Sequence, residues 1–402
     1  MKEQQYRPIL AIVALIVFVD MVGIGLILPV MPQLVGEVAG TSISTSAEIG
    51  GMLLFAYAVM QFLFASFIGG LSDRYGRRPV LLITLTALGL DYVIMALAPT
   101  LTWLVAGRAI SGVMGASWAA ANSCVADAVP VPKRGAAFGL LGGAGAAGFV
   151  LGPAIGGVAG EWSTRLPFVI AATLALSGAV AGYFLLKETL PPERRRRFSA
   201  GRANPFGTLL QAAKTPFVFS SLVTIFFMQL SAQAQMSIWA YWGELTFGWT
   251  PLVSGSTIAF YGVMIVIMQA LIVGRMIERF GAAAVARWSL LLGLPSYALL
   301  ATATSTGMVL LAIVVGSFTG LTFPAMQSLM TQKISEDSQG ELQGGIASVI
   351  GLTAIIGPLM MTQIFGHFTD QTGLFLPGAP YLLSMILLTI AILTLWRAYR
   401  TN

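Results

Sequence analysis

The stretch GGLSDRYG, residues 69–76, returns later in this chain as GRMIERFG, residues 274–281. The positions that recur are Gly69, Asp73, Arg74 and Gly76, matched 205 residues later by Gly274, Glu278, Arg279 and Gly281. The same step relates Gly115 to Gly320, and Gly152–Pro153 to Gly357–Pro358. One step that holds over most of half the chain indicates an internal duplication.

Long apolar runs dominate the sequence around these repeats. The chain has 402 residues, of which 56% are hydrophobic and 9% charged, whereas a soluble domain carries about 25% charged residues. An α-helix needs roughly 20 apolar residues to cross a bilayer core, and barrel strands of about ten residues would alternate in polarity. We therefore predict an all-α integral membrane protein with twelve transmembrane helices, over 8–30, 47–70, 79–98, 102–125, 136–159, 166–187, 217–240, 252–275, 283–303, 306–329, 341–365 and 378–397.

A single long polar stretch, ETLPPERRRRFSAGRANP at 188–205, separates the repeats. Its composition is typical of a linker. We predict a six-helix N-terminal half at 1–187, a cytoplasmic linker at 188–216 and a pseudo-symmetric six-helix C-terminal half at 217–402. Two parallel repeats of this kind are the layout of a secondary transporter, with substrate handled between them at mid-membrane.

The basic residues fall almost entirely on one side of the predicted membrane. Of the 22 Lys and Arg, 20 lie in loops that share one side, Arg165 alone lies on the other side and Arg108 lies inside a span. The positive-inside rule then places both termini in the cytoplasm. The net charge of +6 reflects this topology, so we expect no nucleic-acid partner. The single Cys124 excludes an intramolecular disulfide, and we expect no metal site.

Three charged residues, Asp20, Asp91 and Arg108, lie inside predicted spans. Such a charge costs about 2.5 to 3.5 kcal/mol on insertion scales, so it faces a cavity or a partner. At about 1.5 Å per residue, Asp20 and Asp91 lie roughly 18 Å from the cytoplasmic start of their spans, and Arg108 roughly 9 Å from the outer start of its span. In a core about 30 Å thick all three fall near one level, and they are candidates for one site.

A carboxylate in this setting is suited to proton coupling. Burial favours the protonated form of an acid, and a nearby arginine favours the charged form. We assign proton coupling to Asp20 and Asp91, with Arg108 as the residue that tunes them. The alternative is a static Asp–Arg pair that ties helices together. Contact with a cationic substrate is a further alternative for Asp91, whose neighbour Tyr92 is of a type enriched at membrane interfaces.

Several motifs carry a resemblance to a known family. GGLSDRYGRR (69–78) matches the signature loop of the major facilitator superfamily, and GFVLGPAIGG (148–157) matches the span-five motif of its antiporters. The bacterial tetracycline efflux proteins are resembled by DMVGIGLILPVMP (20–32), LDYVIMA (90–96), GRAISGVMGAS (107–117) and FGWT (247–250). The likeness covers nearly the whole chain. It implies a monomeric drug:proton antiporter of the bacterial cytoplasmic (inner) membrane, which uses the proton gradient and no cofactor.

The loop at 69–78 has a mechanical interpretation as a gate. Its glycines permit tight turns and close helix approach. Asp73 can cap the positive N-terminus of a helix in the other half, near Gly340 in span eleven. Such contacts would hold the cytoplasmic face closed; the alternative is that these charges only set topology. We expect Asp127 to pair with Lys133 or Arg134. The predicted gating residues of this face are Gly69, Asp73, Arg74, Gly76, Arg77, Arg78 and Arg134.

Span five is rich in glycine at four-residue steps, which lets two helices pack backbone to backbone. Its proline removes one helix hydrogen bond and permits a kink. The functional interpretation is a seal against proton leak between the halves, and ordinary close packing is compatible with it. The residues assigned to this role are Gly148, Gly152, Pro153, Gly156 and Gly157.

Neutral polar side chains are the candidates for contact with the drug. The family's drug cavity draws on glutamines of span seven, which match Gln229 and Gln233, and these lie four apart on one helix face. The remaining candidates are Tyr57, Gln61, Trp118, Asn122, Gln269, Gln327 and Gln343. The alternative role for membrane glutamines is to tie helices together.

The sequence departs from the tetracycline efflux pattern in its second half. That family carries a histidine in span eight and an acid in span nine, where this chain has Ile265 and the neighbourhood of Gly293 to Pro295. The only histidine, His367, is expected at the surface. Proton coupling would then rest on the N-terminal half, and a hydrophobic drug other than a magnesium–tetracycline chelate is an open possibility.

Two other classes of function were weighed. An uptake symporter for a sugar or organic acid is the runner-up, and the antiporter motif in span five argues against it. A membrane-embedded enzyme, channel or sensor is the third, and no paired catalytic carboxylates or nucleotide loop support it. We therefore do not expect an enzyme.

Overall fold

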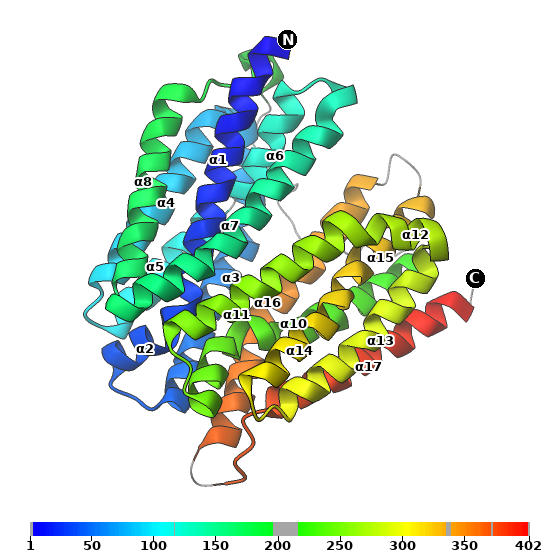
Figure 1. Ribbon diagram of the computed structural model, residues 1–402. Coiled ribbons are helices and arrows are strands. Elements are labelled where there is room, and N and C mark those ends of the chain that lie inside the picture. The colour runs from blue at the N-terminus through cyan, green and yellow to red at the C-terminus, as the bar shows by residue number, and fades with distance from the viewer. Residues whose placement is uncertain (1–2, 116, 196–215, 335–338, 371–372, 401–402) are drawn as a thin grey trace. The chain divides into compact units, whose positions relative to one another are not determined.

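The structure, a computed structural model, describes residues 3–115, 117–195, 216–334, 339–370 and 373–400 (Figure 1). Over these ranges it is helical and contains no β-strand, which confirms the all-α prediction. Eleven described helices are long and apolar enough to cross a membrane. Most of the predicted linker, 196–215, lies outside the described residues.

The chain divides into two compact units. The first unit comprises residues 1–40, 56–204 and 250–259, and the second comprises 41–55, 205–249 and 260–402. Each unit thus includes one short segment from the other half of the sequence.

The helices of the N-terminal half begin and end close to the predicted runs. They are α1 (Glu3–Ile27), η1 (Leu28–Val30), α2 (Met31–Ala39), α3 (Ile43–Tyr75), α4 (Arg77–Leu97), α5 (Leu101–Met114), α6 (Ser117–Ala128), η2 (Val131–Lys133), α7 (Arg134–Trp162), α8 (Leu166–Leu185) and η3 (Pro192–Arg194). In the first unit α1 packs along α7 and α8, while α4 packs on α5, α6 and α8 (Figure 1).

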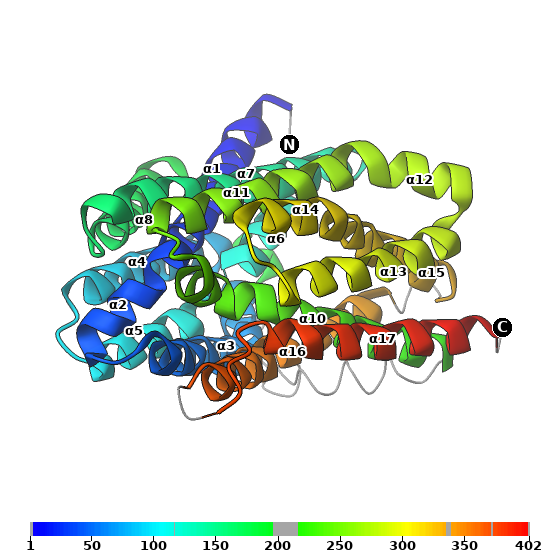
Figure 2. The same cartoon turned by 60° about the horizontal axis from the view of Figure 1, so that its bottom comes forward.

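The C-terminal half has a matching series. It contains α10 (Pro216–Phe247), α11 (Pro251–Ile267), the π-helical turn η5 (Met268–Ile272), α12 (Val273–Phe280), α13 (Ala282–Ala301), α14 (Thr306–Ser317), η6 (Phe318–Leu321), α15 (Thr322–Gln332), α16 (Gln339–Thr369) and α17 (Ala379–Arg400). In the second unit α10 packs along α16 and α17, while α13 packs on α14, α15 and α17 (Figure 2).

The 205-residue step of the sequence is also a step of the structure. Helix starts that follow it are Arg77 and Ala282 for α4 and α13, Leu101 and Thr306 for α5 and α14, Ser117 and Thr322 for α6 and α15, and Arg134 and Gln339 for α7 and α16. The packing pairs within the two units correspond as well, since α1 on α7 is matched by α10 on α16 and α4 on α8 by α13 on α17. The duplication therefore extends to the fold of each unit.

The fourth apolar run, 102–125, differs from its prediction as one continuous helix. It is divided into α5 and α6, and Gly115 lies between them. The tenth run is interrupted at the corresponding place by the 3-10 turn Phe318–Leu321, which contains Gly320. Glycine stabilises a helix poorly, and both interruptions coincide with one. Because α5 and α6 are each short, the predicted fourth span is the one that is missing from the eleven.

Glycines of α7 bring that helix against the backbone of α1, as the sequence predicts. A Cβ built on Gly148 would lie 2.6 Å from the Phe18 carbonyl oxygen, and one on Gly152 would lie 2.6 Å from the Val22 carbonyl oxygen. On Gly156 it would meet the backbone of Leu26. These contacts fix the stretch of α1 that carries Asp20. Pro153 also takes part, because its ring lies against Gly25.

Not every glycine of α7 has this role. Nothing lies within 4 Å of a Cβ built on Gly142 or Gly143, so these two positions carry no close packing. Gly157 faces a different element, the start of α11, where a Cβ would lie 2.7 Å from the Pro251 carbonyl oxygen. This start belongs to the first unit. The glycine stripe thus packs on two helices within the first unit.

Arg165, the one basic residue on its side of the predicted membrane, closes the end of α4. Its Nη1 donates to the carbonyl oxygens of Met95, Ala96 and Ala98 at 3.0 to 3.2 Å. Cations at a helix C-terminus satisfy unpaired carbonyls and complement the helix dipole. A structural role therefore accounts for this exception to the one-sided placement of charge.

Candidate functional site

Asp91 and Arg108 form a buried ion pair between α4 and α5. Arg108 Nη2 donates to Asp91 Oδ2, and the two residues are 0% and 7% exposed. Gly107 permits this approach, since a Cβ there would lie 2.5 Å from Asp91 Oδ1. Ser111, one turn after Arg108, places its hydroxyl beside the same carboxylate. The predicted proximity of these two charges is confirmed.

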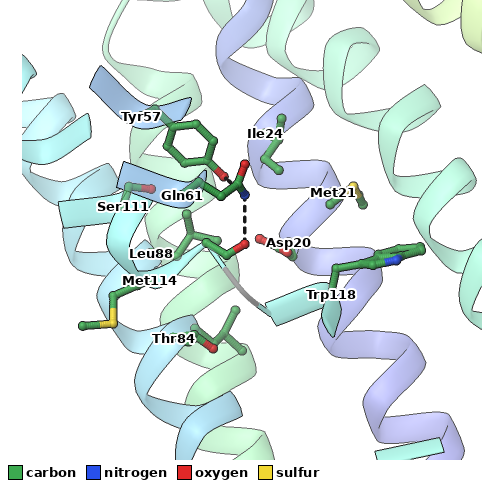
Figure 3. A pocket seen from close by; sticks show the side chains of 12 residues that line it. Asp20, Met21, Ile24, Tyr57, Gln61, Thr84, Leu88, Ser111, Met114 and Trp118 are labelled. Carbon is green, nitrogen blue, oxygen red and sulfur yellow. Dashed lines mark hydrogen bonds between the residues drawn. The ribbon is translucent and has the colours of Figure 1, made fainter. Parts of the chain in front are cut away.

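Asp20 lies on the wall of a separate small cavity within the first unit (Figure 3). The cavity has a volume of about 80 Å³, and Asp20 itself is 5% exposed. Figure 3 shows its carboxylate directed into the same space as Tyr57 and Gln61. The lining comprises Asp20, Met21, Ile24, Tyr57, Gln61, Thr84, Leu85, Leu88, Ser111, Met114, Gly115 and Trp118. The walls are mostly apolar, but a space of this size with a carboxylate and hydroxyl groups on its wall has room for water.

Gln61 connects the cavity to the interruption of the fourth run. Its Nε2 donates to the Gly115 carbonyl oxygen at 2.9 Å and to the Tyr57 hydroxyl at 3.1 Å, as the dashed lines of Figure 3 mark. A Cβ on Gly115 would lie 2.8 Å from Gln61 Nε2 and 2.9 Å from the Tyr57 hydroxyl, so a side chain here would crowd this bond. An α-helix ends with carbonyl groups that lack an intrahelical partner. Gln61 satisfies one of them where α5 ends.

The cavity and the ion pair share an electrostatic environment. The Arg108 guanidinium lies 5.8 Å from the centre of the Tyr57 ring. Tyr57 also lines the cavity with Asp20, so this ring adjoins both the cavity and the ion pair. Tyr92, which follows Asp91 on α4, is 1% exposed and packs against Gly23 of α1.

Trp118 and Asn122, the two candidates on α6, are placed differently. Trp118 lines the cavity and is 41% exposed. Asn122 is not among the lining residues, and its Nδ2 donates to the Trp118 carbonyl oxygen at 3.0 Å on the same helix.

The glutamines of the second half lie in three places on the second unit. Gln229 and Gln233 are half-buried on α10, and Gln233 packs against Gly357 of α16. Gln327 Nε2 donates to Gln343 Oε1 at 3.1 Å, which joins α15 to α16. Gln269 is exposed within η5. Among these five glutamines, Gln327 and Gln343 are the two for which the described structure gives a hydrogen bond to each other.

Arg77 is the centre of the charged cluster at the start of α4. It is 9% exposed and pairs with Asp73 at 2.7 Å and with Asp127 at 2.8 Å, while its Nη1 also donates to Ser72 Oγ. For Asp127 a pairing with Lys133 or Arg134 was expected, and Arg77 is a partner that this expectation did not include. The side chain of Arg134 donates to the Val129 carbonyl oxygen at 3.1 Å.

The remaining gate candidates are more peripheral. Arg74 is exposed, with its guanidinium 5.1 Å from the ring centre of Tyr75. Arg78 donates to the Tyr183 carbonyl oxygen at 2.6 Å. Gly69 lies inside α3, and nothing is within 4 Å of a Cβ built on it. The turn itself is made by Gly76, whose φ of 110° is in the region that favours glycine.

Glu188 is a structural partner of this cluster that sequence reasoning missed. Its carboxylate accepts hydrogen bonds from the backbone N–H groups of Arg77 at 2.9 Å and Arg78 at 3.3 Å, the first two residues of α4. It also accepts from Thr189 and Leu190. The available signal was that α4 begins after a glycine, which has no side chain for capping. The capping group comes from 111 residues away, which no local pattern reveals.

The two positions that depart from the tetracycline efflux pattern have apolar neighbours. The Ile265 side chain lies 2.9 Å from a Cβ built on Gly320, and Gly293 faces Leu388 and Thr319. His367 is exposed and packs edge-on against Phe368. In the described ranges, no three His, Cys, Asp or Glu side chains are grouped so that they could hold a metal ion.

Repeated bundles of membrane-length helices, with an ion pair and a small cavity lined by Asp20 inside one of them, are typical of multi-pass membrane transporters. The chain belongs to the Major Facilitator Superfamily, whose family model matches residues 13–269 and 243–402. The resemblance seen in the sequence motifs is thereby confirmed.

Curated relatives narrow the comparison. The chain is 36% identical over 357 residues to the tetracycline resistance protein, class C, of Escherichia coli, covering 87% of each chain. It is 36% identical over 401 residues to the class G protein of Vibrio anguillarum, covering 98% of each. It is also 28% identical to multidrug resistance protein 2 of Bacillus subtilis (strain 168), covering 87% of this chain and 86% of that protein.

Solved structures share the fold at lower identity. A bacterial homologue of the human lysosomal transporter Spinster, in an inward-facing and unoccupied conformation, matches with a TM-score of 0.78 at 17% identity, covering 99% of this chain and 98% of that one. The human organic anion transporter MFSD10 matches with a TM-score of 0.72 at 22% identity, covering 97% and 99%.

Proposed function

We propose that this protein exports hydrophobic drugs, tetracycline-like or of several kinds, in exchange for protons by alternating access. The observation that carries the proposal is Asp20 on the wall of a buried cavity, beside the Asp91–Arg108 pair. The naming of the curated relatives supports the substrate class. The energy source is the proton gradient, and no cofactor takes part.

Asp20 is the proposed proton carrier. A cavity of about 80 Å³ suits water and a proton, whereas sites for drug-sized ligands are about 300 to 1,000 Å³. Asp91 is already matched by Arg108, and removal of one member of a buried pair leaves the other charge uncompensated. In this division of roles Asp20 exchanges the proton, while Asp91 and Arg108 set the electrostatic field in which it does so.

The neutral polar candidates are assigned to the drug. Tyr57, Gln61 and Trp118 adjoin Asp20, so drug contact there would be sensed at the proton site. The glutamines of the second unit are proposed as further contacts. With Ile265 and Gly293 in apolar surroundings, the proposal does not include a chelated magnesium ion as a recognition element.

The proposed topology has twelve spans, with α5 and α6 together forming the fourth. The halves at 1–187 and 217–402 are joined by a cytoplasmic linker at 188–216, and both termini lie in the cytoplasm. In this proposal the loop at 69–78 holds the cytoplasmic face closed, and the glycine face of α7 seals against proton leak. The protein is proposed to work as a monomer in the bacterial cytoplasmic membrane.

The test is drug-driven proton flux in liposomes that contain the full chain. For each candidate drug, flux is recorded with a pH-sensitive dye for the wild type, for Asp20→Asn and for Glu193→Gln as a matched control. Glu193 is an exposed carboxylate and does not line the cavity that Asp20 lines. We expect Asp20→Asn to reduce flux more than about tenfold, because an amide cannot carry the proton, and Glu193→Gln to leave it unchanged.

Drug-driven flux that survives Asp20→Asn undiminished would show that the proton takes another path. Inward accumulation of a sugar or organic acid, driven by an inward proton gradient, would support a symporter instead. Purified Asp20→Asn must also unfold at the wild-type temperature, so that lost flux is not lost protein.

A further inference from the structure

Ser111 of α5 belongs both to the cavity and to the ion pair. It lines the cavity together with Asp20, and its hydroxyl lies beside the Asp91 carboxylate. Figure 3 shows Ser111 and Asp20 reaching this space from different helices, α5 and α1. The Ser111 side chain is 1% exposed, so its polar contacts are made inside the protein. It is therefore placed where a change at one of the two acids can reach the other.

The Ser111 hydroxyl lacks the partner that buried serines in helices commonly have. Such hydroxyls bond to a carbonyl oxygen three or four residues earlier in the same helix. Ser231 and Ser289 do so in this chain, with the carbonyl oxygens of Met228 and Ala286 at 2.7 and 3.2 Å. Among the described residues, none makes a hydrogen bond of ordinary geometry with Ser111 Oγ. A bond within its own helix therefore does not account for this serine.

One oxygen of the neighbouring carboxylate is in the same situation. Arg108 binds Asp91 Oδ2, whereas Asp91 Oδ1 has no hydrogen-bond partner of ordinary geometry in the described part of the chain. Buried polar atoms are rarely left in this state, because each costs free energy. A turn of the Ser111 hydroxyl toward Asp91 Oδ1 pairs both atoms. The hydroxyl is the donor in this pair, since an ionised carboxylate only accepts.

A hydroxyl that donates to Asp91 keeps its two lone pairs for a second contact. The cavity beside it has a volume of about 80 Å³, enough for water, and Asp20 lies on its wall. The hydroxyl dipole then presents its oxygen, which is its negative end, to the cavity. This orientation favours protonated Asp20, which can donate through a cavity water, over the Asp20 anion.

The other charged or titratable groups around Asp20 come from several helices. Tyr57 of α3 lines the same cavity, and the Arg108 guanidinium lies 5.8 Å from its ring centre. Tyr92 of α4 packs against α1 at Gly23. The helices α6, α7 and α8 also pack on α1, and they carry titratable side chains toward their ends, namely Cys124, Asp127, Arg134, Glu161 and Tyr183. All of these groups are retained when only the Ser111 hydroxyl is removed.

We propose that Ser111 is a positioning residue for the proton on Asp20, which it links through a cavity water to Asp91. The inference rests on the proposed proton-coupled function, in which Asp20 exchanges the proton. It adds the contact through which the Asp91–Arg108 pair acts on that proton. While Asp91 holds the hydroxyl, the Ser111 oxygen faces Asp20 and the proton is retained. Movement of Asp91 away from Ser111 would free the hydroxyl to turn and would favour release of the proton.

The test measures the pH at which Asp20 gains its proton, by infrared difference spectroscopy of the full chain in liposomes. The carboxylic-acid carbonyl band that the wild type shows and Asp20→Asn lacks belongs to Asp20, and its intensity is followed against pH. We expect Ser111→Ala to lower the midpoint by about 0.5 to 1 pH unit, the size of one lost hydrogen bond. Ser111→Thr keeps a hydroxyl and should keep the wild-type midpoint.

Ser177→Ala is the matched control. Ser177 is exposed on α8, and its hydroxyl donates to the Leu174 carbonyl oxygen of the same helix at 3.0 Å. Its removal should leave the midpoint unchanged. The unfolding temperature of each variant is measured in parallel, so that a shifted midpoint is not attributed to lost structure.

An unchanged or raised midpoint in Ser111→Ala would overturn the inference. So would equal shifts in Ser111→Ala and Ser111→Thr, because packing rather than the hydroxyl would then be responsible. Absence of a band that depends on Asp20 would overturn it as well. The export function is tested separately by drug-driven flux. Flux that is lost in Asp20→Asn, together with an unshifted midpoint in Ser111→Ala, would leave export standing and remove this inference alone.

Discussion

Gln61 shows how one side chain in the cavity serves both structure and site. Its amide holds the Gly115 carbonyl oxygen where α5 ends, and it also contacts Tyr57 on the wall that Asp20 shares. Loss of the donor would leave a carbonyl that the helix cannot satisfy. The residue therefore connects the interruption of the fourth run to the cavity that holds the proposed proton site.

Gln61→Leu should destabilise the protein by about 1 to 3 kcal/mol, the usual cost of an unsatisfied buried polar group. The measurement is thermal unfolding of the purified protein. Gln269→Leu is the matched control, because Gln269 is exposed and should tolerate the change. Equal unfolding temperatures for the two variants would contradict the structural role of Gln61.

At the level of single residues, prediction from sequence succeeded where burying a charge in the membrane has a high free-energy cost. A charge inside an apolar run requires a partner or a cavity, and this alone brought Asp20, Asp91 and Arg108 together. It did not anticipate Glu188, or Arg77 as a partner of Asp127, because both contacts join residues far apart in sequence.

The contact between α1 and α7 is the element on which the position of Asp20 depends. Gly148, Gly152 and Gly156 let α7 approach the backbone of α1 on either side of the acid. Such small-residue faces give close helix packing in membranes. Because the facing atoms are backbone, a larger side chain can be accommodated only if one helix moves.

Gly152→Ala should destabilise the protein by about 1 to 3 kcal/mol through overpacking against the Val22 carbonyl oxygen. Gly142→Ala, on the same helix but with open space beside it, should be neutral or stabilising by up to about 1 kcal/mol. Thermal unfolding of both variants in one detergent checks this. If Gly142→Ala lowered the unfolding temperature more than Gly152→Ala, the backbone contact between α7 and α1 would be contradicted.

The spacing of its glycines identified α7 as a close-packing helix, but it included glycines that make no close contact. Gly142 and Gly143 belong to the same sequence pattern and lie in open space. Gly157 packs on α11, whose start a reader of the sequence would assign to the other half. Which glycine meets which helix depends on crossing geometry, and one sequence does not contain it.

At the scale of the whole chain, the repeat and the charge asymmetry together predict a topology. Ser163 lies next to Arg165 on the side with few basic residues, and Arg194 lies in the basic linker region. Cys124 is 0% exposed, so the native thiol gives little background. These positions allow the predicted orientation to be measured directly.

Single cysteines at the two positions should be labelled from opposite sides. In a Cys124→Ser background, Ser163→Cys should react with a membrane-impermeant maleimide in intact cells, whereas Arg194→Cys should react only after the membrane is opened. Labelling of Arg194→Cys in intact cells would invert the proposed topology.

The sequence established the class of fold, because length, composition and the 205-residue step are properties of letters alone. Helix starts at Arg77 and Ala282, and at Ser117 and Thr322, follow that step. What it could not give was the interruption at Gly115, since an apolar run continues through it. An isolated glycine inside such a run weakens a helix without deciding whether it breaks.

The interruption of the fourth run has a consequence for the history of the molecule. It occurs again 205 residues later, at Gly320, although the residues around the two glycines differ. A break at equivalent positions of both repeats is expected if the unit that was doubled already contained it. The acid at position 20 has Ile225 as its counterpart, so the two copies differ in charge although they share the break.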